Sequence, residues 1–153
     1  MQVESRLAQL GLVLPAPPPA AGKYAPTVAA HGLLFISGQL PLAQGRLTSP
    51  GRVGLELSEA DGGAAARLAA LNVLAQIQAA LHGFERLISL LRVDGYVASA
   101  PGWTDQPRVL DSASQLFIDA LGDKGRHART AFAVPQLPLN ASIELVVTAA
   151  VVP

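Results

Sequence analysis

The chain has 153 residues, of which 50% are hydrophobic, 14% charged and 5% aromatic. This length suits one domain with a real hydrophobic core, and so few charges among so many apolar residues exclude an intrinsically disordered chain. The 11 Lys and Arg residues balance the 11 Asp and Glu residues, so the net charge is zero, which counts against a nucleic-acid-binding protein. Without cysteine, the chain has no disulfide framework and no thiolate metal site.

The N-terminal segment has no basic stretch followed by an apolar core, so it is not typical of a secretory signal. Purely apolar stretches such as residues 33–36 are much too short to cross a bilayer. We therefore expect a cytoplasmic protein that has no membrane partner.

The first 21 residues are expected to form an arm on the surface of a single domain that spans residues 1–153. Val3, Leu7 and Leu10 recur at helical spacing and predict a short helix. The prolines between residues 15 and 19 then force an extended segment, because each proline fixes φ and removes a hydrogen-bond donor.

Two strands and a long helix are predicted next along the chain. The His-Gly pair at residues 31–32 indicates a tight turn between strands at residues 24–30 and 33–38. Ser58 can cap a helix whose apolar pattern runs over residues 64–81. The residues that recur every three or four positions in it are Leu68, Leu71, Leu74, Ile77 and Leu81.

The second half of the chain continues with a strand at residues 87–98 and a second helix that begins near Thr104 or Asp105. Two more strands follow, at residues 128–134 and 142–151. The order β-β-α-β-α-β-β predicts an α+β domain with a mostly antiparallel sheet and two helices on one face.

Both faces of the predicted sheet are apolar. In the second strand, Leu33 and Phe35 share one face, and Leu34 and Ile36 the other. In the third, strict alternation places Leu91, Val93 and Val97 on one face, and Ile88, Leu90 and Tyr96 on the other. Because two helices cover only one face, we infer that further copies of the chain cover the second one in a homo-oligomer. The alternative is that the arm and residues 39–57 cover this face within one chain.

Arg129 is the residue that best suggests a binding site. Alternation groups it with the small Ala131 and Ala133, on the face assigned to subunit contacts. The large Phe132 is expected to point into the core, and Glu144 of the adjacent strand to share the surface with Arg129. An arginine can grip a carboxylate bidentately and a glutamate can position a water, so the pair can form a small-carboxylate site between subunits. An interface salt bridge is the alternative.

The other polar motifs indicate no further chemistry. His31, His82 and His127 lack metal-ligand spacing, and each falls at the end of a predicted element, which favours a structural role. Ser37 is not in a nucleophile elbow, because Phe35 replaces the first glycine of that motif. Neither a metal nor an organic cofactor is implied.

Four short segments together match one known pattern. They are Gly22–Tyr24 (GKY), Leu34–Pro41 (LFISGQLP), Ala128–Ala131 (ARTA) and Leu137–Glu144 (LPLNASIE). In these segments, which span residues 22–150 with their surroundings, the chain resembles the RidA family, also called YjgF-like or L-PSP endoribonuclease-like. The N-terminal arm, with residues 103–107 and 125–129, resembles a longer subgroup of that family.

The resemblance implies a chorismate-mutase-like fold of the bacillus type and a homotrimer with clefts between its subunits. It also implies hydrolysis of 2-imino or enamine acids, such as 2-aminoacrylate, to 2-keto acids and ammonia without a cofactor. By the same resemblance, Arg129 holds the substrate carboxylate and Glu144 orients the attacking water. The substrate-binding positions that it implies are Tyr24, Ser37, Gly38, Ser112 and Ala131.

Three positions depart from the family pattern. Thr130 replaces a serine, Ala131 a frequent cysteine, and Ser112 a frequent asparagine, which is expected to change substrate size or lower the rate. The alternative to a deaminase is a non-catalytic, regulatory module that binds a small carboxylate in the same cleft. A third hypothesis is an endoribonuclease-like translation inhibitor, against which the zero net charge counts.

Overall fold

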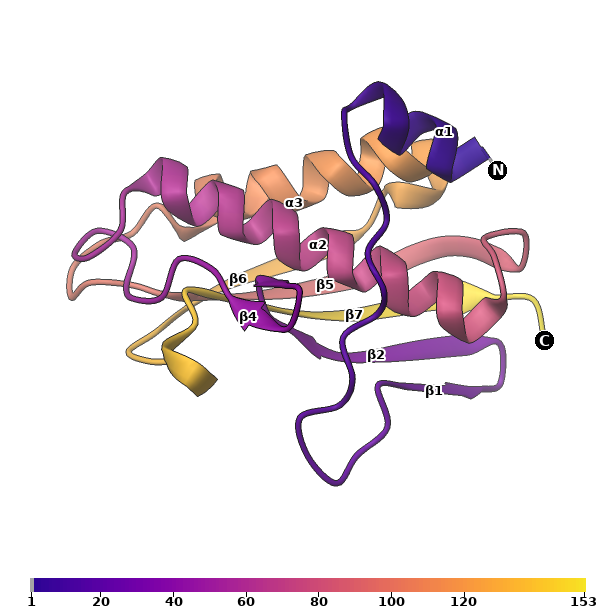
Figure 1. Cartoon of the computed structure of the whole chain (residues 1–153), viewed down its shortest axis with the longest axis horizontal. Helices are drawn as coiled ribbons and strands as arrows, with labels where there is room; N and C mark the ends of the chain where they lie inside the picture. Colours follow the sequence, from indigo (N-terminus) through magenta and orange to yellow (C-terminus); the bar gives the residue numbers. More distant parts are fainter. Residues whose placement is uncertain (1) are drawn as a thin grey trace.

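A five-stranded sheet with helices on one side organises the computed structural model, which describes residues 2–153. Along the chain, the elements are α1 (Gln2–Gln9), β1 (Thr27–Ala30), β2 (Leu33–Gln39), β3 (Leu42–Ala43), β4 (Arg46–Leu47), α2 (Glu59–Leu81), β5 (Leu87–Ala98), α3 (Gln106–Leu121), η1 (Gly122–Gly125), β6 (Ala128–Val134), η2 (Pro138–Asn140) and β7 (Ile143–Val151). The strand order is β1-β2-β7-β5-β6, and neighbours are antiparallel except for the parallel pair β5 and β6. Figure 1 shows α2 and α3 on the same side of this sheet. The predicted α+β fold and its order of elements are confirmed.

The two strongest local signals of the sequence fold as predicted. His31 and Gly32 have φ values of 52° and 75°, as a two-residue type I′ turn between antiparallel strands requires. The Ser58 hydroxyl accepts a hydrogen bond from the Asp61 N–H (3.1 Å), and the Asp61 carboxylate accepts one from the Ser58 N–H (2.9 Å). This capping box starts α2 at Glu59, earlier than the apolar pattern alone predicts.

Helix α2 lies at the centre of the core. Its buried residues pack in one cluster with buried residues of β2, β5, β7 and α3. By length and composition α2 could cross a membrane, but 67% of its apolar window is buried inside the protein, as expected for a core helix.

Strand β5 departs from the predicted alternation. Leu90 and Val93 are both buried under the helices, whereas Ile88 and Leu91 are 51% and 41% exposed on the other face. The pairing of β5 with β7 shifts register twice between residues 87 and 92. Each bulge adds a residue and inverts the alternation, so the predicted grouping of Leu91 with Val93 and of Leu90 with Ile88 is wrong.

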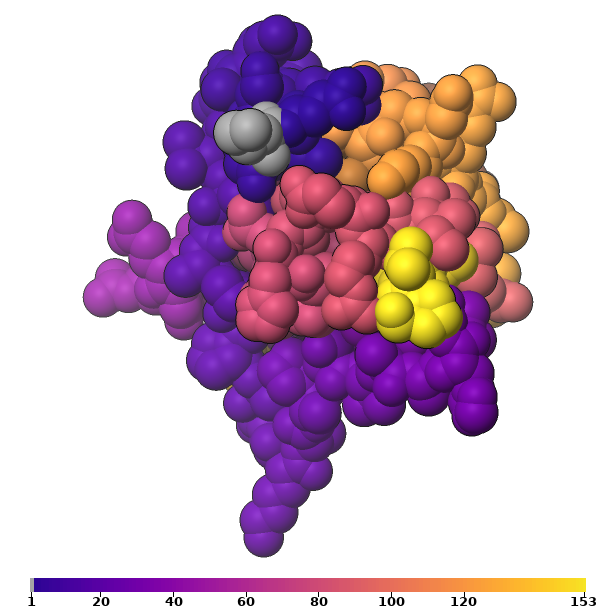
Figure 2. All heavy atoms as spheres, turned by 90° about the vertical axis from the view of Figure 1, so that its right-hand side faces the viewer, coloured from indigo at the N-terminus to yellow at the C-terminus, as the bar shows by residue number. Residues whose placement is uncertain are grey.

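The sheet face opposite α2 and α3, which we name the open face, carries exposed apolar side chains. They include Val28, Phe35, Ile88, Leu91 and Phe132. The N-terminal arm runs elsewhere: Gln76 of α2 donates a hydrogen bond to Pro18 O (2.6 Å), and the arm crosses the outside of α2 (Figure 1). Residues 21–25 are exposed, and Figure 2 shows this part of the chain projecting from the body of the molecule. Because the apolar side chains of the open face remain 41–55% exposed, the alternative in which the arm and residues 39–57 cover this face is wrong.

Candidate functional site

Strand β6 forms an edge of the sheet and turns Arg129 towards the helices. Arg129 is the partner of Val93 in β5, whose side chain is buried beneath them, and paired neighbours face the same side. Phe132 instead lies on the open face, 43% exposed, with its ring stacked on Tyr96 (centroids 5.3 Å apart). The prediction that Arg129 faces the subunit-contact side and Phe132 the core is therefore wrong.

The close approach of α3 explains why small residues mark the covered side of β6. Ala131 is the partner of Gly95 in β5, and a Cβ atom on Gly95 would overlap Leu110 of α3. Large side chains do not fit between this helix and the strands. The small Ala131 therefore marks a surface that α3 covers, and not the face for subunit contacts to which alternation assigned it.

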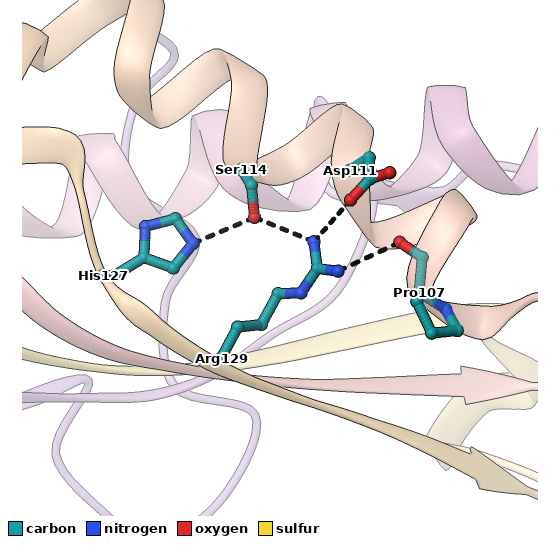
Figure 3. A network of polar contacts seen from close by, with 5 residues as sticks. All are labelled: Pro107, Asp111, Ser114, His127 and Arg129. Atoms are coloured by element: carbon teal, nitrogen blue, oxygen red, sulfur yellow. Dashed lines mark hydrogen bonds and ion pairs between the residues drawn. The ribbon is translucent and has the colours of Figure 1, made fainter.

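Three groups of α3 hold the Arg129 guanidinium (Figure 3). Nη1 donates to Asp111 Oδ1 (3.0 Å) and to Ser114 Oγ (3.1 Å), and Nη2 donates to Pro107 O (3.2 Å). The Arg129 side chain is only 21% exposed, whereas that of Asp111 is 69% exposed. Within residues 2–153, Nε and the second hydrogen of Nη2 have no hydrogen-bond acceptor, so donors remain with which this fork can bind a carboxylate.

A second row of contacts lies behind the guanidinium. His127 Nδ1 is 2.7 Å from Gly125 O, and His127 Nε2 is 2.9 Å from Ser114 Oγ. Burial lowers the pKa of His127, the hydrogen bond to Gly125 O opposes this shift, and the nearby charge of Arg129 adds to it. The ring is therefore neutral near pH 7.

Glu144 lies on the other side of the sheet from Arg129. Its partner in β5 is Tyr96, which faces the open side. Burial raises the pKa of the Glu144 carboxyl, and within residues 2–153 no hydrogen bond or ion pair compensates for that burial. Gly38 packs against this carboxylate so closely that a Cβ atom there would overlap it.

A bulge at the end of β2 brings Gly38 to this position. The pairing of β2 with β7 shifts register between residues 36 and 39. Ser37 Oγ donates to Ala25 O (2.7 Å), which ties the bulge to the segment before β1. Tyr24, which is 52% exposed, lines a small cavity of about 40 Å³ together with Gly38.

The predicted site residues thus form two groups on opposite faces of the sheet. Arg129 and Ala131 lie on the helix-covered side, and Glu144 lies on the open side with Gly38 against it. Tyr24 and Ser37 lie beside Gly38, in the segment before β1 and at the bulge of β2. Ser112 belongs to neither group, because its hydroxyl lies against Gly63 of α2. The prediction that Arg129 and Glu144 converge on one face of one chain is wrong. Their roles as site residues stay predictions.

Sequence reasoning missed the partners of Arg129. Pro107, Asp111 and Ser114 are spaced i, i+4 and i+7, which places them on one face of α3. That face could have been found from the sequence by asking which polar residues share a helical stripe. His127 was assigned a structural role at the end of an element, and its bond to Ser114 was not foreseen.

Comparison with known proteins places this architecture in a recognised class, the chorismate-mutase-like α+β fold. Residues 4–151 match the family model described as "YjgF/chorismate_mutase-like, putative endoribonuclease". The chain belongs to this YjgF/RidA family, which is also called L-PSP endoribonuclease-like.

Three relatives illustrate the range of similarity. The chain is 38% identical over 145 residues to Protein TCP17 of Trypanosoma cruzi, which covers 94% of this chain and 91% of that protein. A crystal structure described as a putative endoribonuclease from Shewanella oneidensis is 34% identical, with a TM-score of 0.95 and coverage of 99% of this chain and 100% of that one. E. coli TdcF with bound serine is 22% identical, with a TM-score of 0.66 and coverage of 88% and 92%, and shares the fold.

Proposed function

We propose that this protein hydrolyses 2-imino and enamine acids to 2-keto acids and ammonia, at a site that two copies of the chain form together. The observation that carries the proposal is the contrast between Arg129 and Glu144. The first is a guanidinium that keeps hydrogen-bond donors free, and the second is a half-buried carboxylate without a hydrogen bond or ion pair in residues 2–153. The two lie on opposite faces of one sheet, so a site that uses both needs the edge of one copy against the open face of another.

Arg129 would hold the substrate carboxylate. Its planar fork matches a carboxylate, and its charge draws an anion into a partly buried position. The serine bound in E. coli TdcF also carries a carboxylate next to a nitrogen-bearing carbon, which supports this substrate class.

Glu144 would move the protons of the reaction. Water attacks C2 of the 2-iminium acid, and Glu144 takes a proton from that water, which leaves a carbinolamine. Glu144 then returns the proton to nitrogen, the C–N bond breaks, and the hydroxyl on C2 gives its proton to the departing ammonia, so that the keto acid and ammonium are the products. A carboxyl whose pKa is raised by burial suits this exchange near neutral pH. An enamine enters the same route after protonation of its β-carbon, and no metal or organic cofactor is needed.

The open face supports the assembly that this site requires. Its exposed apolar side chains come from β1, β2, β5 and β6, and a patch spread over so many strands is typical of an interface. We propose a homotrimer, in which Tyr24, Ser37 and Gly38 line the cleft beside Glu144. Residues 21–25 project from the body and can reach a neighbouring copy (Figure 2).

The test is to generate 2-aminoacrylate with a serine dehydratase and to follow its decay. Wild-type protein should accelerate hydrolysis, and Arg129→Ala should lower kcat/KM by about a hundredfold or more. Arg126→Ala is the matched control, because the Arg126 side chain is 79% exposed and pairs with the exposed Asp123. Decay at the uncatalysed rate with wild-type protein, or equal rates for wild type and Arg129→Ala, would overturn the proposal.

A carboxylate-binding module without turnover is the second candidate. It is favoured by the Asp111 contact, which already neutralises part of the Arg129 charge and would weaken capture of a transient substrate. This candidate expects 2-ketobutyrate to stabilise the protein, Glu144→Gln to keep that affinity, and 2-aminoacrylate to decay no faster than in buffer.

RNA cleavage is the function that the family description suggests. The exposed arginines Arg92, Arg108 and Arg126 each pair with an acidic side chain, and the 11 Asp and Glu residues balance the 11 Lys and Arg residues, which counts against attraction to a phosphate backbone. RNA binding that falls with salt and survives Arg129→Ala would favour this function.

A further inference from the structure

Ser114 and His127 have no part in the reaction described above, yet both lie directly behind Arg129. We infer that they are positioning residues, which hold Arg129 ready for the substrate carboxylate only while His127 is neutral. This inference deepens the proposed function and rests on it.

The direction of each hydrogen bond supports a single arrangement. Gly125 O can only accept, so His127 Nδ1 carries the hydrogen of a neutral ring. His127 Nε2 is then an acceptor and receives the Ser114 hydroxyl hydrogen at 2.9 Å. The Ser114 oxygen is left with lone pairs, one of which accepts from Arg129 Nη1 at 3.1 Å. The guanidinium is therefore held through a chain of bonds that ends on the backbone.

The packing around His127 makes this arrangement rigid. The ring meets Phe117 of α3 edge-on, with centroids 5.7 Å apart. Gly125 lies so close to the backbone of Phe117 that a Cβ atom at Gly125 would overlap the carbonyl there. The carbonyl that fixes the His127 ring is thus itself fixed against α3, the helix that carries Ser114.

Protonation of His127 would disturb the chain of bonds at its centre. The imidazolium Nε2 would become a donor, so the Ser114 hydrogen would have to turn away, and two cations would flank one hydroxyl. The charged groups that face this region are Arg129 and its partner Asp111 on α3. On η1, Lys124 donates to Leu87 O, and Asp123 pairs with Arg126.

Two substitutions of His127 separate its roles. His127→Gln can keep an acceptor near the position of Nε2 but cannot titrate, whereas His127→Asn is too short to reach Ser114. Ser114→Ala removes the hydroxyl itself. We expect Ser114→Ala and His127→Asn to raise the Kd for 2-ketobutyrate, and KM for the imino acid, by about tenfold, with a smaller change in kcat.

The pH profile provides the readout that a merely structural role would not change. In wild-type protein, affinity for 2-ketobutyrate should fall on acidification in a range below the ordinary histidine pKa of about 6.5, because burial lowers the pKa of His127. His127→Gln should keep the neutral-pH affinity and lose this fall. His82→Asn and Gln115→Ala, at two exposed positions outside the contacts of Arg129, are the controls and should behave as wild type.

Nuclear magnetic resonance of the Arg129 side chain tests the inference without any assay of activity. Rotation about the Cζ–Nη bonds should be slow in wild type and in His127→Gln, and fast in Ser114→Ala. Unchanged rotation in Ser114→Ala, or an acidic fall in affinity that persists in His127→Gln, would overturn the inference. If Arg129 is held as described but wild type neither binds 2-ketobutyrate nor hydrolyses 2-aminoacrylate, the proposed function fails and the positioning of Arg129 stands.

Discussion

The two faces of the sheet differ in the polar partners that they give to their charged residues. On the helix-covered side, α3 supplies three acceptors for Arg129, and the half-buried His127 contacts one of them, Ser114. On the open side, the half-buried Glu144 carboxylate lies against Gly38 and has no hydrogen bond or ion pair in residues 2–153. The geometry of Arg129 is therefore set within one chain, whereas Glu144 has no hydrogen-bond or ion-pair partner in residues 2–153.

The largest effect is expected from a charge placed on the open face, because this face is the proposed interface between copies. Phe132→Asp introduces a carboxylate where the ring stacks on Tyr96, and we expect self-association to weaken by about a hundredfold or more, since a charge in an apolar interface core is left desolvated. Sedimentation velocity at micromolar concentration measures this. Ile118→Asp is the matched control: Ile118 is 41% exposed on α3, close to the 43% of Phe132, and should leave the assembly intact. Equal behaviour of the two variants, or a wild-type monomer, would contradict the assigned interface.

The next largest effect is expected from mixing two inactive variants, which tests whether Arg129 and Glu144 act from different copies of the chain. Arg129→Ala and Glu144→Gln each remove one half of the proposed site, so each alone should lose nearly all activity. If the two halves come from different copies, exchange of subunits should restore about a quarter of the sites, because random mixing pairs an intact Arg129 with an intact Glu144 at that frequency. Mixed protein that stays as inactive as its components would mean that both residues act within one chain or that neither acts.

The sequence predicted the fold better than it predicted the site, and the reasons are local. The His31-Gly32 turn and the Ser58 cap each depend on a few neighbouring residues, so their signals survive in a single sequence. The predicted alternation of β5 was wrong because the strand contains two bulges, and the amino-acid composition does not reveal them. The prediction of the face on which Arg129 lies was wrong because it depends on the packing of α3 against the strands, which a single sequence does not show directly.

A methyl group at Gly38 should test the tight contact on the open side. Gly38→Ala places a Cβ atom on the Glu144 carboxylate, which has to move, so we expect kcat/KM to fall by about tenfold or more while carboxylate binding at Arg129 changes little. The same substitution in a Glu144→Ala background should cost almost nothing further, because the colliding group is gone. Independent, additive losses in the double variant would show that Gly38 acts through another contact.

The smallest expected effect concerns stability and pH. Burial raises the pKa of Glu144 in the folded protein above that of the unfolded chain, so folding takes up a proton between the two values, and stability falls as pH rises through that window. Glu144→Gln cannot ionise and should melt a few degrees higher than wild type at neutral pH, at about 2–4 °C per kcal/mol, with no difference below both pKa values.

Calorimetry between about pH 3 and pH 8 measures this difference. Asp105→Asn, at an exposed position whose side chain makes no cap hydrogen bond, should show none. A lower melting temperature for Glu144→Gln at neutral pH would mean that a neighbouring copy donates to this carboxylate. Glu144 would then have a hydrogen-bond partner in the assembly, as Arg129 has within the chain. The difference between the two faces would in that case exist only in the isolated chain.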